Sequence, residues 1–220
     1  MNFTQLKAAR TDRGWSQQEA AARLGVSQGY LSLLESGRRS GAPLARKLMD
    51  VYDLSPTVLP VSEALVDVSA DSLAHDLASL GYPGFAHLSS KGRRTNPAEY
   101  LLKALGQHNL EARVAEGLPW LVLKYPDMPF EWLVREARAS NLQNRLGFAV
   151  TLGRRAANSE NLVQLESTLA DSKLAKEDTF CRELKDGERH WLREHSSDEA
   201  KQWHLLSDLQ PSSLRYVTAA

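Results

Sequence analysis

Two glutamines begin closely spaced polar segments near the start of the sequence. Gln17 follows a serine in "SQQE" (16–19), and Gln28 follows a serine in "SQGY" (27–30). A glutamine side chain can form two hydrogen bonds to an adenine, through N6 and N7, in the major groove of DNA. Arg38 and Arg39 follow shortly afterwards, and guanidinium groups neutralise phosphates. These residue types are suited to nucleic-acid recognition, provided that short helices hold them on one surface.

Capping residues and glycines divide residues 1–60 into short predicted helices. The segment 16–19 has the capping-box pattern, in which a serine and a glutamate satisfy free backbone donors at a helix start. Gly25 ends this helix, and Ser27 caps the next one. The predicted helices cover residues 3–12, 17–24, 28–35 and 42–52, with a short fifth helix beginning at Ser55-Pro56. The second and third form a helix-turn-helix unit, which places its second helix in the major groove.

Residues 5–59 resemble the lambda-repressor-like (Xre-type) DNA-binding domain. The resemblance rests on Leu6, Arg10, Gly14 to Glu19, Ala21, Leu24 to Ser27, Leu31, Ser32, Leu34, Glu35, Gly37, Leu48, Tyr52 and Leu54. It covers a quarter of the chain and implies a five-helix, all-α domain. It also implies that the protein binds double-stranded operator DNA as a homodimer, on half-sites one helical turn apart.

The predicted contacts with DNA fall into two groups. The candidates for base contacts are Gln28, Gly29, Ser32 and Leu33, and those for phosphate contacts are Gln17, Tyr30, Arg38 and Arg39. Gly29 permits close approach without reading a base, and Leu33 either packs on a thymine methyl group or belongs to an apolar flank. The family usually has a basic residue at the position of Arg38, which favours a phosphate contact over a solvated turn.

The resemblance also implies two internal roles. Gln17 matches a family glutamine that binds a phosphate and supports the first residue of the third helix, here Gln28. Arg10 and Glu35 match a pair that forms a buried salt bridge between the first and third helices. The role of this pair is architectural, because it orients the recognition helix and makes no base contact.

The charge distribution permits DNA binding by the N-terminal part alone. The net charge is zero, but residues 1–60 contain eight Lys or Arg and five Asp or Glu, and the rest contains nineteen and twenty-two. Residues 1–60 therefore carry a net charge of +3, and residues 61–220 carry a net charge of −3. The sequence has a single cysteine, Cys181, which excludes an internal disulfide and suits a reducing cytoplasm. No apolar run reaches the length of a membrane span, and "MNFTQLKAAR" lacks the apolar core of a secretory signal.

We predict a connector at residues 61–72 and a larger helical domain at 73–220. Asn96-Pro97-Ala98-Glu99 is a strong helix start, with a cap, a proline at the first position and a glutamate at the third. Further helices are expected near 110–124, 130–139, 141–157, 160–171, 178–195 and 198–207. No stretch alternates apolar and polar residues for long enough to indicate a strand.

An internal similarity occurs in this domain at a spacing of 32 residues. "YLLKALGQHNLEAR" (100–113) aligns with "WLVREARASNLQNR" (132–145), and Leu165, Leu169 and Leu174 weakly continue the spacing. Stacked helical hairpins produce a period of this size. The alternative is coincidence between two amphipathic helix pairs, and the sequence leaves both interpretations open.

The larger domain shows no pattern that indicates catalysis. His190 and His195 are spaced awkwardly for joint ligation of a metal, and Gly81-Tyr82-Pro83-Gly84 lacks the residues of a phosphate loop. We therefore expect no enzyme activity, no metal and no cofactor. The aromatic-rich segment 117–137 contains Trp120, Phe130 and Trp132, for which core packing is the favoured role and a partner interface the alternative.

Two segments of this domain also resemble Xre-type antitoxins paired with nucleotidyltransferase-like toxins of the abortive-infection type. They are "LEARVAEGLPWLVLKYPDMPFEWLVREA" (110–137) and "NLQNRLGFAVTLGRR" (141–155). The resemblance implies that the larger domain binds a toxin while the N-terminal domain represses the operon. The alternative is a stand-alone regulator whose helical domain senses a peptide or a small ligand.

Overall fold

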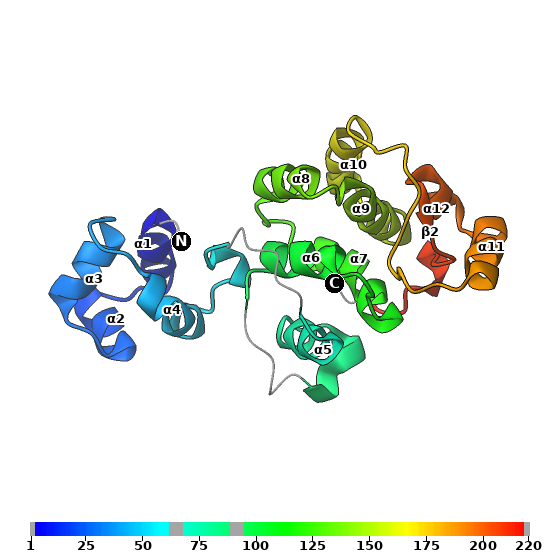
Figure 1. Cartoon of the computed structure of the whole chain (residues 1–220). Coiled ribbons are helices and arrows are strands. Elements are labelled where there is room, and N and C mark those ends of the chain that lie inside the picture. The colour runs from blue at the N-terminus through cyan, green and yellow to red at the C-terminus, as the bar shows by residue number, and fades with distance from the viewer. Residues whose placement is uncertain (1–2, 62–67, 89–94, 218–220) are drawn as a thin grey trace. The chain divides into compact units, whose positions relative to one another are not determined.

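The computed structural model describes residues 3–61, 68–88 and 95–217. The chain divides into two compact units, Met1–Val61 and Ser62–Ala220, which we call the head and the body and describe separately (Figure 1). The expected all-α class is confirmed, because the strands in the described ranges amount to two segments of two residues each.

The head is built around short helices that share one apolar core. Its described elements are α1 (Phe3–Asp12), α2 (Gln17–Leu24), α3 (Gln28–Glu35), the 3-10 turn η1 (Ala42–Leu44), α4 (Ala45–Tyr52) and the 3-10 turn η2 (Pro56–Val58). Leu6, Leu24, Leu31, Leu48 and Tyr52 are fully buried at its centre. Each helix supplies only one or two of these side chains, so burial of the shared core stabilises helices that would be too short to persist alone.

The fifth helix expected in the head is a single 3-10 turn. Ser55 caps it by accepting a hydrogen bond from the backbone N–H of Thr57. Leu59 is extended, with ψ 146°, because the ring of Pro60 disfavours helical geometry in the residue before it. With Pro56 at its first position and Pro60 two residues after its end, η2 is confined to one turn.

The body contains most of the long helices. Its described elements are α5 (Ala70–Ser79), η3 (Pro83–Leu88), α6 (Pro97–Gly106), α7 (Ala112–Lys124), α8 (Phe130–Ala139), α9 (Gln143–Ala157), η4 (Glu160–Leu162), α10 (Val163–Ala170), β1 (Asp178–Thr179), α11 (Asp186–His195), α12 (Asp198–Gln202), β2 (Leu205–Leu206) and η5 (Pro211–Ser213). The start predicted for α6 is confirmed, since the Asn96 side chain accepts a hydrogen bond from Ala98 N at 2.9 Å. Within the predicted connector, residues 62–67 lie outside the described residues, and 70–72 belong to α5.

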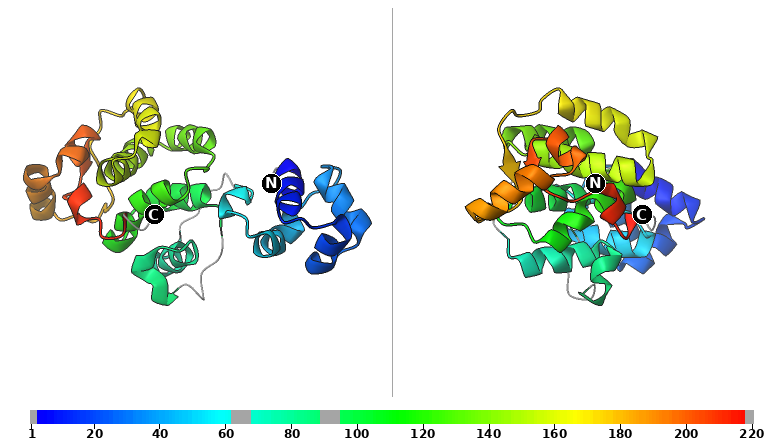
Figure 2. Two further views of the ribbon diagram at one scale, coloured as in Figure 1. Left: turned by 180° about the vertical axis from the view of Figure 1, so that it is seen from behind. Right: turned by 90° about the vertical axis from the view of Figure 1, so that its right-hand side faces the viewer.

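The two similar segments of the sequence form two helical hairpins. Residues 100–113 run from α6 into α7, and residues 132–145 run from α8 into α9. The helices pack in pairs, α7 along α9 and α6 against α8. Figure 1 labels these helices, and Figure 2 gives two further views of the same ribbon. Leu101 and Leu133 occupy equivalent positions and are both fully buried. The spacing does not extend to a third hairpin, because Leu174 lies after α10, where the chain leads to β1.

Two helix predictions near the C-terminus are wrong in part. The helix expected over 178–195 begins only at Asp186, and the helix expected over 198–207 ends at Gln202. Four of the remaining residues form the parallel pair β1–β2, with Asp178 opposite Leu205 and Thr179 opposite Leu206. Tertiary packing overrides local helix propensity at this point.

Trp203 shows how this packing works. Its indole is fully buried and donates a hydrogen bond to Thr151 Oγ1 at 2.7 Å. A Cβ at Gly147 would lie 2.3 Å from the Trp203 ring, so only glycine permits the approach. The chain turns directly after Trp203, where His204 has φ 51°, and then enters β2.

Candidate nucleic-acid interface

The turn between α2 and α3 is fixed by the residues that the sequence pattern indicates. Ser16 Oγ accepts from Glu19 N at 3.2 Å, and a Glu19 carboxylate oxygen accepts from Ser16 N at 2.8 Å, which completes the capping box. Gly25 has φ +61°, a left-handed conformation that other residues adopt only with strain. Ser27 Oγ then accepts from Tyr30 N at 3.1 Å and starts α3. The position of α3 on the head therefore follows from local sequence.

A chain of four side chains connects the core of the head to the first residue of α3. The Arg10 guanidinium donates two hydrogen bonds to the Glu35 carboxylate, at 2.6 and 3.1 Å. Gln17 Nε2 donates to the same carboxylate at 2.9 Å, and Gln17 Oε1 accepts from Gln28 Nε2 at 2.8 Å. Because each link is direct, the orientation of the Gln28 amide depends on the position of the Arg10–Glu35 pair.

The Arg10–Glu35 pair is largely removed from water. The side chains of Arg10 and Glu35 are 10% and 3% exposed, and Arg10 also donates to the backbone oxygen of Trp15 at 2.8 Å. Burial would raise the pKa of Glu35, but the hydrogen bonds from Arg10 and Gln17 and the charge of Arg10 outweigh it and lower this pKa. Glu35 is therefore a carboxylate at neutral pH and holds both of its donors in place.

The predicted base-contact residues lie on the surface of α3 to different degrees. Gln28 and Gly29 are exposed, Leu33 is 39% exposed and Ser32 is half-buried. A Cβ added at Gly29 would meet no atom within 4 Å, so the packing of the head does not require a glycine there. Because Gly29 has no side chain, another surface can approach α3 closely at this position.

The two arginines after α3 are held beside it. The backbone N–H groups of Arg38 and Arg39 both donate to the Leu33 carbonyl, at 3.0 and 3.2 Å, and both residues are exposed. The Arg39 guanidinium lies over the Tyr30 ring, 4.6 Å from its centroid. The sequence does not indicate this cation–π contact, because Tyr30 lies within α3 and Arg39 beyond its C-terminal end. The structure thus brings together two of the predicted phosphate-contact residues.

The three aromatic candidates for a partner interface lie in the body and differ in exposure. Trp120 is 1% exposed and packs against Tyr82, with 5.4 Å between ring centroids, so core packing, its favoured role, is confirmed and the alternative of an interface anchor is wrong. The reason is that α7, which carries it, is covered by α5, α6 and α9. Phe130 and Trp132 are half-buried against the core of the body.

We expect replacement of Gln28 by alanine to weaken specific binding by about 1–3 kcal/mol and to relax the preference at one base pair. The reason is the loss of a bidentate amide whose position is fixed by Gln17. Affinities for duplexes that differ at single base pairs measure the effect. The matched control is Gln18→Ala, which removes an exposed amide of α2 and should leave every base preference unchanged. Unaltered specificity in the Gln28 variant would contradict the assignment.

Arg38→Ala should weaken binding to all duplexes alike, because a phosphate contact carries no sequence information. The plot of log affinity against log salt concentration should become shallower by about one unit. Lys124→Ala, which removes an exposed cation of the body, should leave this slope unchanged. A fixed slope together with weaker binding to a single sequence would show that Arg38 reads bases.

Comparison with known proteins agrees with this geometry. Residues 6–59 match the helix-turn-helix family. Neither the curated proteins nor the solved structures include a match to the chain. In the described ranges, 3–61, 68–88 and 95–217, no three His, Cys, Asp or Glu side chains are grouped as metal ligands. No helix in these ranges is both long and apolar enough to cross a membrane.

Proposed function

We propose that this protein, a DNA-binding transcription regulator by its helix-turn-helix domain, is a repressor and the antitoxin of a toxin–antitoxin module. In this proposal the head binds an operator as part of a homodimer, and the body binds and silences a co-encoded toxin in the cytoplasm. The body contributes binding and no catalysis.

The DNA-binding half of the proposal is supported by the anchored amide at the start of α3. Gln28 is exposed, and its hydrogen bond to Gln17 connects it to a buried ion pair. An anchored side chain loses less conformational freedom on binding than a free one. We infer that this arrangement presents the amide to a base edge in one fixed orientation.

The toxin-binding half of the proposal is supported by the separate core of the body. Trp120, Phe148 and Trp203 are buried in that core, whereas a different set of side chains forms the core of the head. A domain with its own core can carry a second function. The resemblance of residues 110–137 and 141–155 to antitoxins of this kind implies that the partner is a toxin.

Co-expression of the full chain with the product of the adjacent gene tests the proposal. We expect a stable complex on size exclusion and rescue of growth that the adjacent gene product alone would inhibit. The Gln28→Ala variant should repress the operon less but should still form the complex and rescue growth, because toxin binding is assigned to the body. If the folded wild-type chain neither binds the adjacent gene product nor rescues growth, the antitoxin proposal is wrong, and the proposal of a ligand-sensing regulator replaces it.

A further inference from the structure

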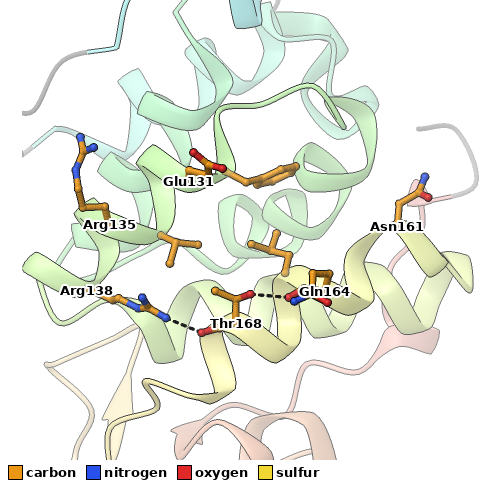
Figure 3. Close-up of a pocket in the computed structure, with 9 residues that line it drawn as sticks. Glu131, Arg135, Arg138, Asn161, Gln164 and Thr168 are labelled. Carbon is orange, nitrogen blue, oxygen red and sulfur yellow. Dashed lines mark hydrogen bonds between the residues drawn. The ribbon is translucent and has the colours of Figure 1, made fainter.

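A groove of about 630 Å³ lies between α8 and α10 on the body (Figure 3). Phe130, Val134 and Leu165 supply its apolar lining, and Glu131, Arg135 and Gln164 are among its polar residues. Val134 is nearly buried, whereas Phe130 and Leu165 are half-buried and keep part of their apolar surface exposed. The sequence gives no sign of this groove, because α8 and α10 belong to separate segments of the chain that are brought together when both pack on α9.

The spacing of the lining residues matches the surface of another helix. On α8 they include residues 130, 134 and 138, and on the opposite wall residues 161, 165 and 168. Positions separated by three or four residues form one helical face, and each wall extends over about two turns, roughly 12 Å. An amphipathic helix that binds in a groove uses apolar side chains at this same spacing.

The charges of the groove favour an acidic side chain on the occupant. Arg135 is 65% exposed, and its ion pair with the adjacent Glu136 lies at the surface, where such pairs contribute little. Arg138 connects the two walls, since it donates to Thr168 O at 2.7 Å (Figure 3). It also donates to Ser172 Oγ at 2.9 Å. Against these two guanidinium groups the groove has the single carboxylate of Glu131.

We infer that this groove receives an amphipathic helix of the protein partner, with apolar side chains against Phe130 and Leu165 and an acidic side chain beside Arg135. The inference rests on the proposed function and names the surface by which the body holds the co-encoded toxin.

The test compares groove variants of the full chain with matched controls, using the product of the adjacent gene as the probe. Gln164→Trp fills the groove from an exposed position, and Ser167→Trp places the same side chain on α10 outside the groove lining. Arg135→Glu reverses a charge of the groove, and Lys124→Glu reverses an exposed charge elsewhere. We expect both groove variants to weaken the complex by about tenfold or more, and both controls to bind like the wild type.

Circular dichroism identifies variants that have failed to fold. If the folded groove variants bind the probe like the wild type, the groove inference is wrong although the antitoxin proposal stands. If the wild type forms no complex, both are wrong. A lower molar mass of the Gln164→Trp chain alone, measured by light scattering, would show that the groove holds a second copy of this chain and would overturn the inference.

Discussion

Replacement of Arg10 by methionine is expected to destabilise the head by about 3–5 kcal/mol, because it leaves the Glu35 carboxylate buried without its counter-charge. The Glu35 side chain is 3% exposed, and of its two donors only the neutral Gln17 amide would remain. Arg13→Met is the matched control. Arg13 is exposed, and its replacement should change the stability by little.

Fluorine NMR of the fluorotryptophan-labelled full chain separates the unfolding of the two units. Trp15 is the one tryptophan of the head, so its resonance follows that unit during a urea titration, and the other four follow the body. Arg10→Met should shift the Trp15 transition alone. The double variant Arg10→Met/Glu35→Leu should recover much of the stability, because no unpaired charge remains. Normal stability of the single variant would show that the pair does not hold the head together.

The same pair gives the head a dependence on acid. The pKa of Glu35 is lower in the folded head than its ordinary value of 4.5. Its contribution to stability is therefore fully present above that ordinary value and is lost as the pH falls through the lower, folded pKa. In Arg10→Met this part of the acid destabilisation should disappear, since the partner that lowers the pKa is gone.

In the body, Arg145→Met should have an effect of similar size, about 3–5 kcal/mol. The Arg145 side chain is 2% exposed and donates two hydrogen bonds to the Asp178 carboxylate, at 2.7 and 2.9 Å. It also donates to the backbone oxygens of Leu105, Gln107 and Thr179. This single guanidinium therefore joins α9 to the end of α6, to the turn that follows it and to β1. Its loss leaves three backbone acceptors without this donor and the Asp178 carboxylate without its ion-pair partner, although Asp178 Oδ1 still accepts from Thr179 N at 2.8 Å.

The internal similarity supplies the control for this prediction. Arg113 occupies the position of the first segment that aligns with Arg145 in the second, but it is exposed. Arg113→Met should thus leave the urea transition of the body nearly unchanged, whereas Arg145→Met should move it strongly. Equal effects of the two substitutions would contradict the role assigned to the buried guanidinium.

The two arginines also show which features a sequence can reveal. In the head, the ends of α2 and α3 depend on Ser16, Gly25 and Ser27, whose caps and turn lie within a few residues of one another. Such features are local and can be predicted. Arg113 and Arg145 occupy equivalent positions in the sequence, and their difference in burial arises only when β1 packs beside α9.

The features of the candidate site likewise fall into those that local sequence predicts and those that arise only from packing. The composition of α3 predicts the polar residues that face outward. The Arg10–Glu35 ion pair is predicted by the resemblance of residues 5–59 to the lambda-repressor-like domain. The burial of Trp120 and the groove between α8 and α10 depend on segments distant in sequence. Helical periodicity identifies an apolar face but not the element that will cover it.

Selection of duplexes from a random pool by the full chain measures whether α3 reads a DNA sequence. We expect an enriched motif with two symmetric half-sites, about one helical turn or 34–36 Å apart, and a footprint over both. The Gln28→Ala chain should enrich the same motif with one position of each half-site relaxed. A pool that shows no enriched sequence, or a motif that is identical for the wild-type and Gln28→Ala chains, would contradict sequence reading by α3.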